Sequence, residues 1–331
     1  NCYCDLVFIN NVLGIEKIAR SVTKHMWNSN LIKLHNSWND ISIEHTTEPI
    51  YHYTSRIGLD GIFENRQLWA NDIYKQNDKS EGLYVLDVLE KNITSFGIQE
   101  DYKNAILRRV KIIKSLDEES YELRKHRSFI ISFSIAGDEL ALWNYYTKNE
   151  DSVGYNVMFD TKMLTDKIKI KKLIRDNDAN AYYPGIIDDN IRHGKVIYDE
   201  CRQCEIMKRE IEKFEKYFDK NNDLCEYLLV EKILWIGNFF KSPYFKHEYE
   251  YRLAFFVGTD LEYPSKDRIA VEVRGEKKNH IEVYYNPNSI LAVTCSPTNK
   301  RDDIEYARKF VTNAFPNFKS VNISKIPFRV I

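Results

Sequence analysis

The chain of 331 residues carries 48 lysines and arginines against 49 aspartates and glutamates, a formal net charge of −1. This balance provides no overall field to attract nucleic acid or a membrane surface, so any such binding has to come from a local patch. Apolar residues make up 43% of the chain, and the longest apolar runs are far shorter than the roughly 20 residues that span a bilayer. We expect a cytoplasmic protein that does not contact a membrane.

The spacing of the six cysteines bears on metal binding. Cys201 and Cys204 have the C-x-x-C spacing, but the other close pair, Cys2 and Cys4, has a single intervening residue, and no H-x-x-x-H accompanies them. The pattern favours reduced thiols over a structural zinc site.

The first elements follow from periodicity and capping residues. Residues 1–46 have helical spacing without strand alternation. The segment E-P-I-Y-H-Y reads as a strand in which His52 points away from its tyrosine neighbours, and Ser55 is placed to cap the helix that follows. Asp78, with Glu81 three residues later, has the capping-box spacing ahead of another helix.

The rest of the chain mixes helical and strand patterns. Helices are expected over 100–127, 137–147, about 201–220, 223–240 and 302–315. Strands are expected over 68–70, 128–135, 153–160, 168–174, 194–199, 248–257, 267–274, 280–287, 289–295 and 327–331. We expect the run 128–135 to be central because it is β-branched and aromatic, and the four strands between 248 and 295 to form a meander.

Few βα units alternate, and helices interrupt the run of strands, which favours an α+β fold over a doubly wound sheet. We expect a mixed, mostly antiparallel sheet with helices outside it. The expected division is a helical N-terminal extension, residues 1–46, and one larger domain, residues 47–331, with a helical insert at about 200–240.

Several short blocks occur in an order that resembles the bacterial domain-of-unknown-function 2971 family. They are Y-H-Y-T-S, G-L-D-G-I-F-E-N-R-Q-L-W-A-N-D, N-D-K-S-E, F-I-I-S-F-S, G-D-E-L-A-L-W-N-Y-Y-T, V-G-Y-N-V-M-F-D, K-V-I-Y-D, F-K-H-E-Y-E-Y-R-L, I-E-V-Y-Y-N-P-N-S-I and P-F-R-V-I, and they cover roughly residues 50–331. This resemblance brings with it a further similarity to the ADP-ribosyltransferase fold. In that fold a histidine on a strand, an aromatic residue in mid-sheet and a glutamate on a late strand surround NAD.

That similarity implies an NAD-dependent ADP-ribosyltransferase, with NAD consumed as a substrate and no metal. Proteins of such groups often act as toxins or in phage defence, which implies an RNA, DNA or protein acceptor and a neutralising antitoxin or defence-system partner. The chain has no Walker-type phosphate loop, no G-x-G-x-x-G after a strand, no G-x-S-x-G and no H-E-x-x-H. The missing dinucleotide fingerprint argues against hydride transfer, but not against cleavage of NAD.

Breaking the bond between nicotinamide and ribose passes through an oxocarbenium-like transition state, as in glycoside hydrolysis. A carboxylate beside the ribose stabilises that charge. In H-E-Y-E-Y-R-L the alternation puts Glu248, Glu250 and Arg252 on one strand face. Glu250 and Glu248 are the predicted catalytic residues: Glu250 stabilises the developing charge, and Glu248 orients Glu250 or activates the acceptor. Arg252 is predicted to bind the cofactor, by holding a carboxylate or a phosphate. The alternative is a solvated strand face with charge pairing.

The predicted cofactor-binding residues come from two blocks. With the resemblance, the ring of His52 is expected to donate to an adenosine-ribose hydroxyl of NAD, while the neighbouring backbone holds the nicotinamide amide. Tyr53 and Thr54 are also predicted to bind NAD, Thr54 through its hydroxyl. Trp143 and Tyr146, in L-W-N-Y-Y-T, are expected to offer an aromatic face to the cationic nicotinamide. The alternatives are a structural histidine and an aromatic core cluster.

Two other functions remain open from the sequence. One is a metal-dependent nuclease or phosphodiesterase that uses Asp78, Glu81, Glu248 and Glu250, because two-metal chemistry requires clustered carboxylates. The other is a non-catalytic interaction module whose charged helices bind a partner.

Overall fold

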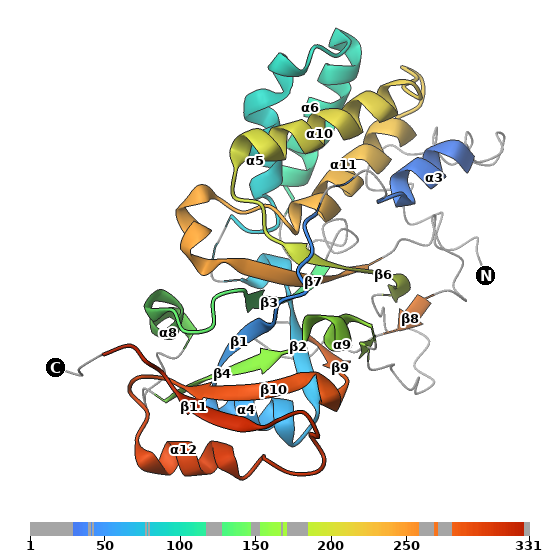
Figure 1. Ribbon diagram of the computed structural model, residues 1–331. Coiled ribbons are helices and arrows are strands. Elements are labelled where there is room, and N and C mark those ends of the chain that lie inside the picture. The colour runs from blue at the N-terminus through green and yellow to red at the C-terminus, as the bar shows by residue number, and fades with distance from the viewer. Residues whose placement is uncertain are drawn as a thin grey trace.

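The computed structural model describes residues 29–38, 41, 43–76, 78, 80–116, 128–146, 153–166, 168–170, 185–257, 268–270 and 280–327. Figure 1 shows a group of helices stacked on one end of a twisted sheet, and the short helices α4 (Arg56–Phe63) and α12 (Arg301–Arg308) at the other end. The described helices and strands confirm the α+β class. The helices expected before residue 29 lie outside the described residues.

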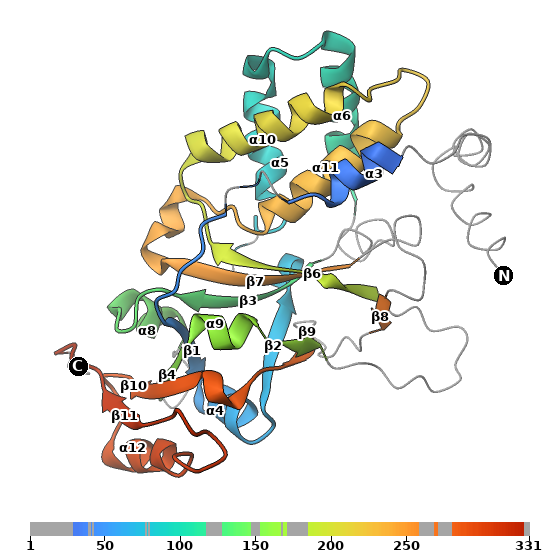
Figure 2. The same cartoon turned by 45° about the vertical axis from the view of Figure 1, so that its right-hand side comes forward.

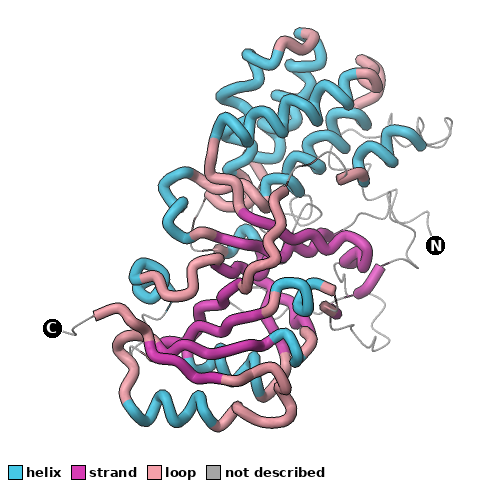
Figure 3. The backbone as a smooth tube through the Cα atoms, viewed as in Figure 1, coloured by secondary structure: helices cyan, strands magenta, loops and turns pink. Residues whose placement is uncertain are grey.

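Eleven strands form the described part of the sheet (Figure 3). Their order is β11-β10-β4-β1-β3-β2-β9-β5, with β7 on the other edge of β3, β6 on β7 and β8 on β6. All of these pairs are antiparallel except β10–β11, which confirms the expected mixed, mostly antiparallel sheet. The strands are β1 (Ile50–Ser55), β2 (Gln67–Asp72), β3 (Ser128–Ser134), β4 (Gly154–Phe159), β5 (Lys169–Ile170), β6 (Gly185–Lys195), β7 (Glu250–Val257), β8 (Arg268–Ala270), β9 (His280–Tyr284), β10 (Ile290–Cys295) and β11 (Ser320–Ile323).

Strand β3 is central, as expected, and it has three partners. One edge pairs with β7 along the whole strand. The other edge is shared: Ser134 pairs with Tyr51 of β1, while Ile130 and Phe129 pair with the end of β2. Strands β1 and β2 therefore separate beside the middle of β3, and this fork opens one face of the sheet.

The helical group consists of α3 (Ser29–Asn36), α5 (Tyr84–Asn92), α6 (Glu100–Lys114), α10 (Glu200–Glu215) and α11 (Leu224–Gly237) (Figure 2). Helix α11 is buried on nearly all sides, because its sequence L-C-E-Y-L-L-V-E-K-I-L-W-I-G is apolar around most of its circumference. Its one buried lysine, Lys232, is paired with Glu210 of α10 at 2.7 Å and donates to the carbonyl of Leu34 at 2.6 Å. The helices α10 and α11 correspond to the expected insert. No helix in the described ranges is long and apolar enough to cross a membrane.

The predicted meander is wrong. The strands β7, β8, β9 and β10 follow one another in sequence, but none of them pairs with the next. Strand β7 pairs with β3 and β6, β8 with β6, β9 with β2 and β5, and β10 with β4 and β11. Alternation of apolar residues identifies a strand and its faces, but it does not identify its neighbours. The last described strand is β11, ahead of the predicted strand over 327–331, of which residues 328–331 lie outside the described part.

Of the two helix caps predicted from the sequence, one is confirmed and one is wrong. Ser55 does cap α4, and its side chain accepts from the N–H of Gly58. The capping box at Asp78 and Glu81 is wrong, because α5 begins only at Tyr84 and its N-cap, Leu83, makes no side-chain capping bond. Asp78 instead accepts from the N–H and hydroxyl of Ser80. The Glu81 side chain accepts from Arg252.

Two neighbouring isoleucines of α6 provide a matched test of the helical core. Ile113 is 1% exposed and Ile112 is 39% exposed. We expect Ile113→Ala to lower the free energy of unfolding by about 2–5 kcal/mol, because it leaves a cavity among packed helices. Ile112→Ala should lower it by less than about 1 kcal/mol, since an exposed side chain has less contact to lose. Urea unfolding measures both values, and equal losses would contradict this packing.

Candidate active site

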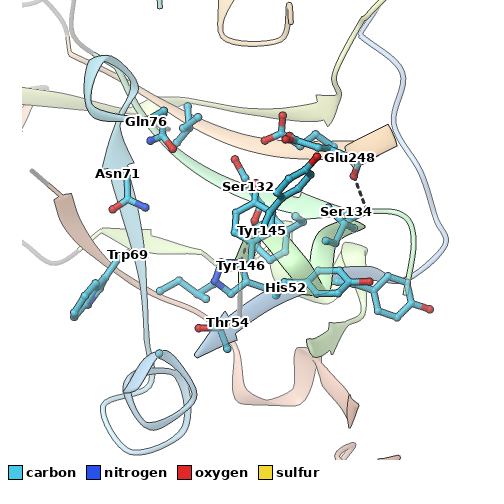
Figure 4. A pocket seen from close by; sticks show the side chains of 18 of the residues that line it. His52, Thr54, Trp69, Asn71, Gln76, Ser132, Ser134, Tyr145, Tyr146 and Glu248 are labelled. Atoms are coloured by element: carbon cyan, nitrogen blue, oxygen red, sulfur yellow. Dashed lines mark hydrogen bonds between the residues drawn. The ribbon is translucent and has the colours of Figure 1, made fainter. Parts of the chain in front are cut away.

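A pocket of about 630 Å³ occupies the fork between β1 and β2. Each strand contributes residues that alternate along it and therefore share a face: His52 and Thr54 from β1, Ser132 and Ser134 from β3, and Trp69 and Asn71 from β2. Figure 4 shows these side chains around the opening, with Glu248 and Trp69 at opposite ends. The volume lies in the range of small-molecule sites, about 300–1,000 Å³.

Two carboxylates close one end of the pocket. Glu250 is the first residue of β7, and Glu248 is the last residue of the 3₁₀ turn η3 (Pro243–Glu248). Between them Tyr249 has φ 48°, in the left-handed region, so the chain turns and the two side chains do not follow strand alternation. Both carboxylates nevertheless contact the same ammonium group, because Lys241 Nζ lies 2.6 Å from Glu248 Oε2 and 3.1 Å from Glu250 Oε2.

Arg252 lies behind these carboxylates and is fully buried. Its Nε and Nη2 donate to Glu250 at 3.2 and 2.7 Å, its Nη2 also pairs with Glu81, and its Nη1 donates to the carbonyl of Asn238 at 2.7 Å. Arg252 is not among the residues that line the pocket. Its guanidinium positions Glu250, and the predicted contact of Arg252 with a cofactor finds no support in this geometry. The alternative of a solvated strand face is wrong, because Glu248, Glu250 and Arg252 are all buried.

The three carboxyl groups of the cluster differ in acidity. Burial alone raises the pKa of Glu250, but Arg252 and Lys241 more than offset this and lower it to about 2. Burial raises the pKa of Glu248, and repulsion by Glu250 adds to the effect. Burial also raises the pKa of Glu81, in spite of Arg252. Glu250 is therefore held ionised, whereas Glu248 and Glu81 take up protons above the ordinary range of a carboxyl group.

His52 lies where β1 leaves β3. Its Nδ1 is 3.0 Å from the carbonyl oxygen of Ser132. A carbonyl only accepts, so Nδ1 carries the proton and the neutral ring keeps a lone pair on Nε2. Burial lowers the pKa of His52, which favours this neutral form. The ring lines the pocket as an acceptor through Nε2, and not as the donor expected for a ribose hydroxyl.

The other predicted binding residues divide into two groups. Thr54 and Tyr146 line the pocket, and burial together with Glu250 and Glu248 raises the pKa of Tyr146 well above its usual value, so it stays a neutral phenol. Tyr53 also lines the pocket, but its hydroxyl is committed to the carbonyl of Ala136 and the N–H of Glu139. Trp143 is buried against Tyr53 outside the pocket lining, and its Nε1 donates to Asp138 at 2.8 Å. Trp143 is thus a core residue that supports α8 (Leu140–Tyr146).

Lys241 and Ser132 were not predicted to belong to this site, and Glu81 was named only as a capping residue and as a carboxylate of the alternative nuclease. Lys241 carries no sequence signal because it reaches the carboxylates from the end of the helical insert. Ser132 lies on the pocket face of β3, and its hydroxyl contributes to the low pKa of Glu250 by hydrogen bonding. A polar residue inside the otherwise apolar S-F-I-I-S-F-S was the available signal.

The described residues contain no group of three or more histidines, cysteines, aspartates or glutamates placed to hold a metal ion. Asp78 lines the pocket, and the carboxylates of Glu81, Glu248 and Glu250 form ion pairs with Lys241 and Arg252. In a two-metal site those carboxylates would ligate the metals instead. The metal-dependent nuclease stays a prediction.

Removing Arg252 tests the buried cluster. We expect Arg252→Met to lower the free energy of unfolding at pH 7 by about 3–5 kcal/mol, because it leaves Glu250 and Glu81 buried without their partner. The deficit should shrink as the pH falls toward 5, because unpaired buried carboxylates take up protons above their usual pKa. Urea unfolding at several pH values measures this.

The matched control is Arg308→Met, which removes an exposed guanidinium paired with Glu305 at 2.6 Å. It should cost less than about 1 kcal/mol at every pH. A pH-independent deficit in Arg252→Met would show that the arginine acts by packing and not by charge.

Part of the chain matches a known protein family. The model of the family DUF2971, described as a protein of unknown function, matches residues 142–253. The matched segment is 253 − 142 + 1 = 112 of 331 residues, and it contains Lys241, Glu248, Glu250 and Arg252 but not β1, β2 or Glu81. No curated protein and no solved structure matches the chain. The resemblance to the domain-of-unknown-function 2971 family is therefore confirmed over about a third of the chain.

Proposed function

We propose that the protein is an NAD-dependent ADP-ribosyltransferase whose active site is the pocket at the sheet fork. The observation that carries the proposal is the pair Glu248 and Glu250 at one end of this pocket, with pKa values shifted in opposite directions. Two carboxyl groups separated in this way suit two different tasks in one reaction. An ADP-ribosyltransferase-like arrangement of the sheet is part of the same proposal.

Glu250 would stabilise the transition state. As the bond between ribose C1′ and the nicotinamide nitrogen breaks, the electron pair leaves with nicotinamide and positive charge develops on the ribose. A carboxylate with a pKa of about 2 stays ionised and fixed by Arg252, so it opposes this charge without reorganisation. Glu248, with its raised pKa, would take the proton of the acceptor O–H or N–H group as the new bond to C1′ forms.

The charge count favours a cationic ligand at this end. Among the described residues Glu81, Glu248 and Glu250 form ion pairs with two cations, Lys241 and Arg252, so the fully ionised cluster has one negative charge in excess. The nicotinamide ring of NAD carries a positive charge, and aromatic faces also attract such rings. Tyr145 and Tyr146 line the same end, and Tyr145 is 55% exposed.

The sugar and phosphates of NAD would lie along the fork between β1 and β2, on the side away from Glu248 and Glu250. The Nε2 lone pair of His52 would accept from a ribose hydroxyl, next to Thr54. Among the described lining residues Lys241 is the only basic one, and Glu248 and Glu250 already hold it. The phosphates would therefore rely on main-chain N–H groups, and those at the start of α4 lie next to Ser55, Ile57 and Gly58 of the lining.

We also propose the biological setting implied by the sequence resemblance. The enzyme would modify RNA, DNA or protein in the cytoplasm as a bacterial toxin or phage-defence effector, with a neutralising partner. Expression of the wild-type chain would then slow growth of a bacterial host, and Glu250→Gln would relieve this.

The first test is release of nicotinamide from NAD by the purified protein. We expect Glu250→Gln to lower the rate about 100- to 1,000-fold, because the fixed negative charge is lost. The variant should still fold, since Glu81 and Glu248 then balance Lys241 and Arg252. Glu64→Gln, at an exposed ion pair with Lys309, is the matched control and should leave the rate unchanged. An unchanged rate in Glu250→Gln, or no release by the wild type with RNA, DNA or lysate protein added, would contradict the proposal.

The second test is the pH dependence of that rate. Glu248 acts as a base only when deprotonated, so the rate should rise with pH through a pKa above its ordinary value. Glu248→Gln should lower the rate and remove this acid limb. In Glu250→Gln the residual activity should show the limb at lower pH, because the repulsion that raises the pKa of Glu248 is gone. A limb that does not move would mean that another group controls it.

A further inference from the structure

The end of the pocket opposite the carboxylates is lined by one face of β2. Gln67, Trp69 and Asn71 alternate along that strand and share the face, while Leu68 and Ala70 between them are buried in the core. Figure 4 shows Trp69 and Asn71 on this strand, away from Glu248. The transfer chemistry proposed above does not involve any of these side chains.

Trp69 is an exposed aromatic platform. It is 48% exposed, whereas the core tryptophan Trp235 is fully buried. The ring of His280 covers one of its faces, with centroids 4.3 Å apart and planes 19° from parallel. Stacked on His280 and about half exposed, the ring presents accessible aromatic surface at the pocket. An indole held flat in this way at a pocket offers a stacking surface for a planar ring.

Amide groups lie beside this platform. The structure records no hydrogen bond of the Asn71 side chain to any described residue, so it offers an adjacent donor and acceptor to the pocket. Gln76 donates its Nε2 to the carbonyl of Asp72 at 3.0 Å, which leaves its Oε1 as an acceptor. Gln67 is instead committed to Glu282 at 3.4 Å. A carboxamide with both groups available matches the paired donor and acceptor on the edge of a nucleobase.

We infer that Trp69 and Asn71 form a nucleobase-binding subsite, in which the base stacks on Trp69 and its edge bonds to Asn71. The base belongs either to the adenosine half of a dinucleotide whose other half reaches the carboxylates, or to a single-stranded nucleic acid acceptor. The subsite extends the proposed function but does not rest on it, because stacking of a base requires no cleavage of NAD.

The test is isothermal titration of the full chain with AMP, and with ribose 5-phosphate as a probe that lacks the base. We expect the wild type to bind AMP and Trp69→Ala to bind it about 5- to 150-fold more weakly, the range expected for loss of one base–aromatic stack. Trp69→Phe should keep part of the affinity. Tyr244→Ala removes a ring that is 89% exposed and lies outside the pocket lining, and it should change nothing.

Further titrations with NAD, nicotinamide mononucleotide and a short single-stranded RNA identify the source of the base. If Trp69→Ala weakens NAD but not nicotinamide mononucleotide, the base is the adenine of the dinucleotide. If it weakens the RNA but not NAD, the base belongs to the acceptor. Equal AMP affinities for wild type and Trp69→Ala, or no binding of AMP, NAD or RNA by the wild type, would overturn the subsite. Glu250→Gln should bind AMP normally, so failure of catalysis and failure of the subsite are distinguishable.

Discussion

The arrangement of this protein depends on one buried guanidinium. Arg252 projects from β7, and it joins the catalytic candidate Glu250 to Glu81 ahead of α5 and to the last turn of α11 through the carbonyl of Asn238. The side chain of Arg252 thus connects the sheet and the helical group to two carboxylates that line the pocket. A buried charge with several fixed partners is expensive to disturb, so the relative position of these three parts is strongly specified.

The same cluster links stability to chemistry. The pairing of Glu250 with Arg252 and Lys241 stabilises the fold at pH values above the ordinary pKa of a glutamate. This contribution is lost as the pH falls toward about 2. The raised pKa values of Glu248 and Glu81 act in the opposite direction, because their contribution is present at low pH and lost as the pH rises through them. An excess of one carboxylate over the cations thus carries an energetic penalty in the free protein, and a positively charged transition state would offset it.

Sequence analysis predicted what depends on local patterns. The strand at His52, the cap at Ser55 and the central strand over 128–135 were correct, because periodicity and capping residues act over a few positions. The prediction that Glu248, Glu250 and Arg252 share one strand face was wrong, because β7 begins at Glu250 and Glu248 lies beyond the left-handed turn at Tyr249. The two carboxylates are brought together by their ion pairs with Lys241, and Arg252 pairs with Glu250. The contact of Glu81 with Arg252 spans 171 residues and the strand order spans the whole sheet, and neither leaves a local signature.

The fork at β3 has a mechanical consequence. On one side β1 continues into β4, β10 and β11, and on the other β2 continues into β9 and β5, so two wings of the sheet diverge from the same edge of β3. The wings are tied to that edge of β3 by the pair Tyr51–Ser134 and by two pairs at the end of β2, and α4 packs on both strands. The angle between the wings therefore bears on the separation of His52 and Trp69 across the pocket. A ligand that touches His52 on one wing and Trp69 on the other would act as a spacer that fixes this angle.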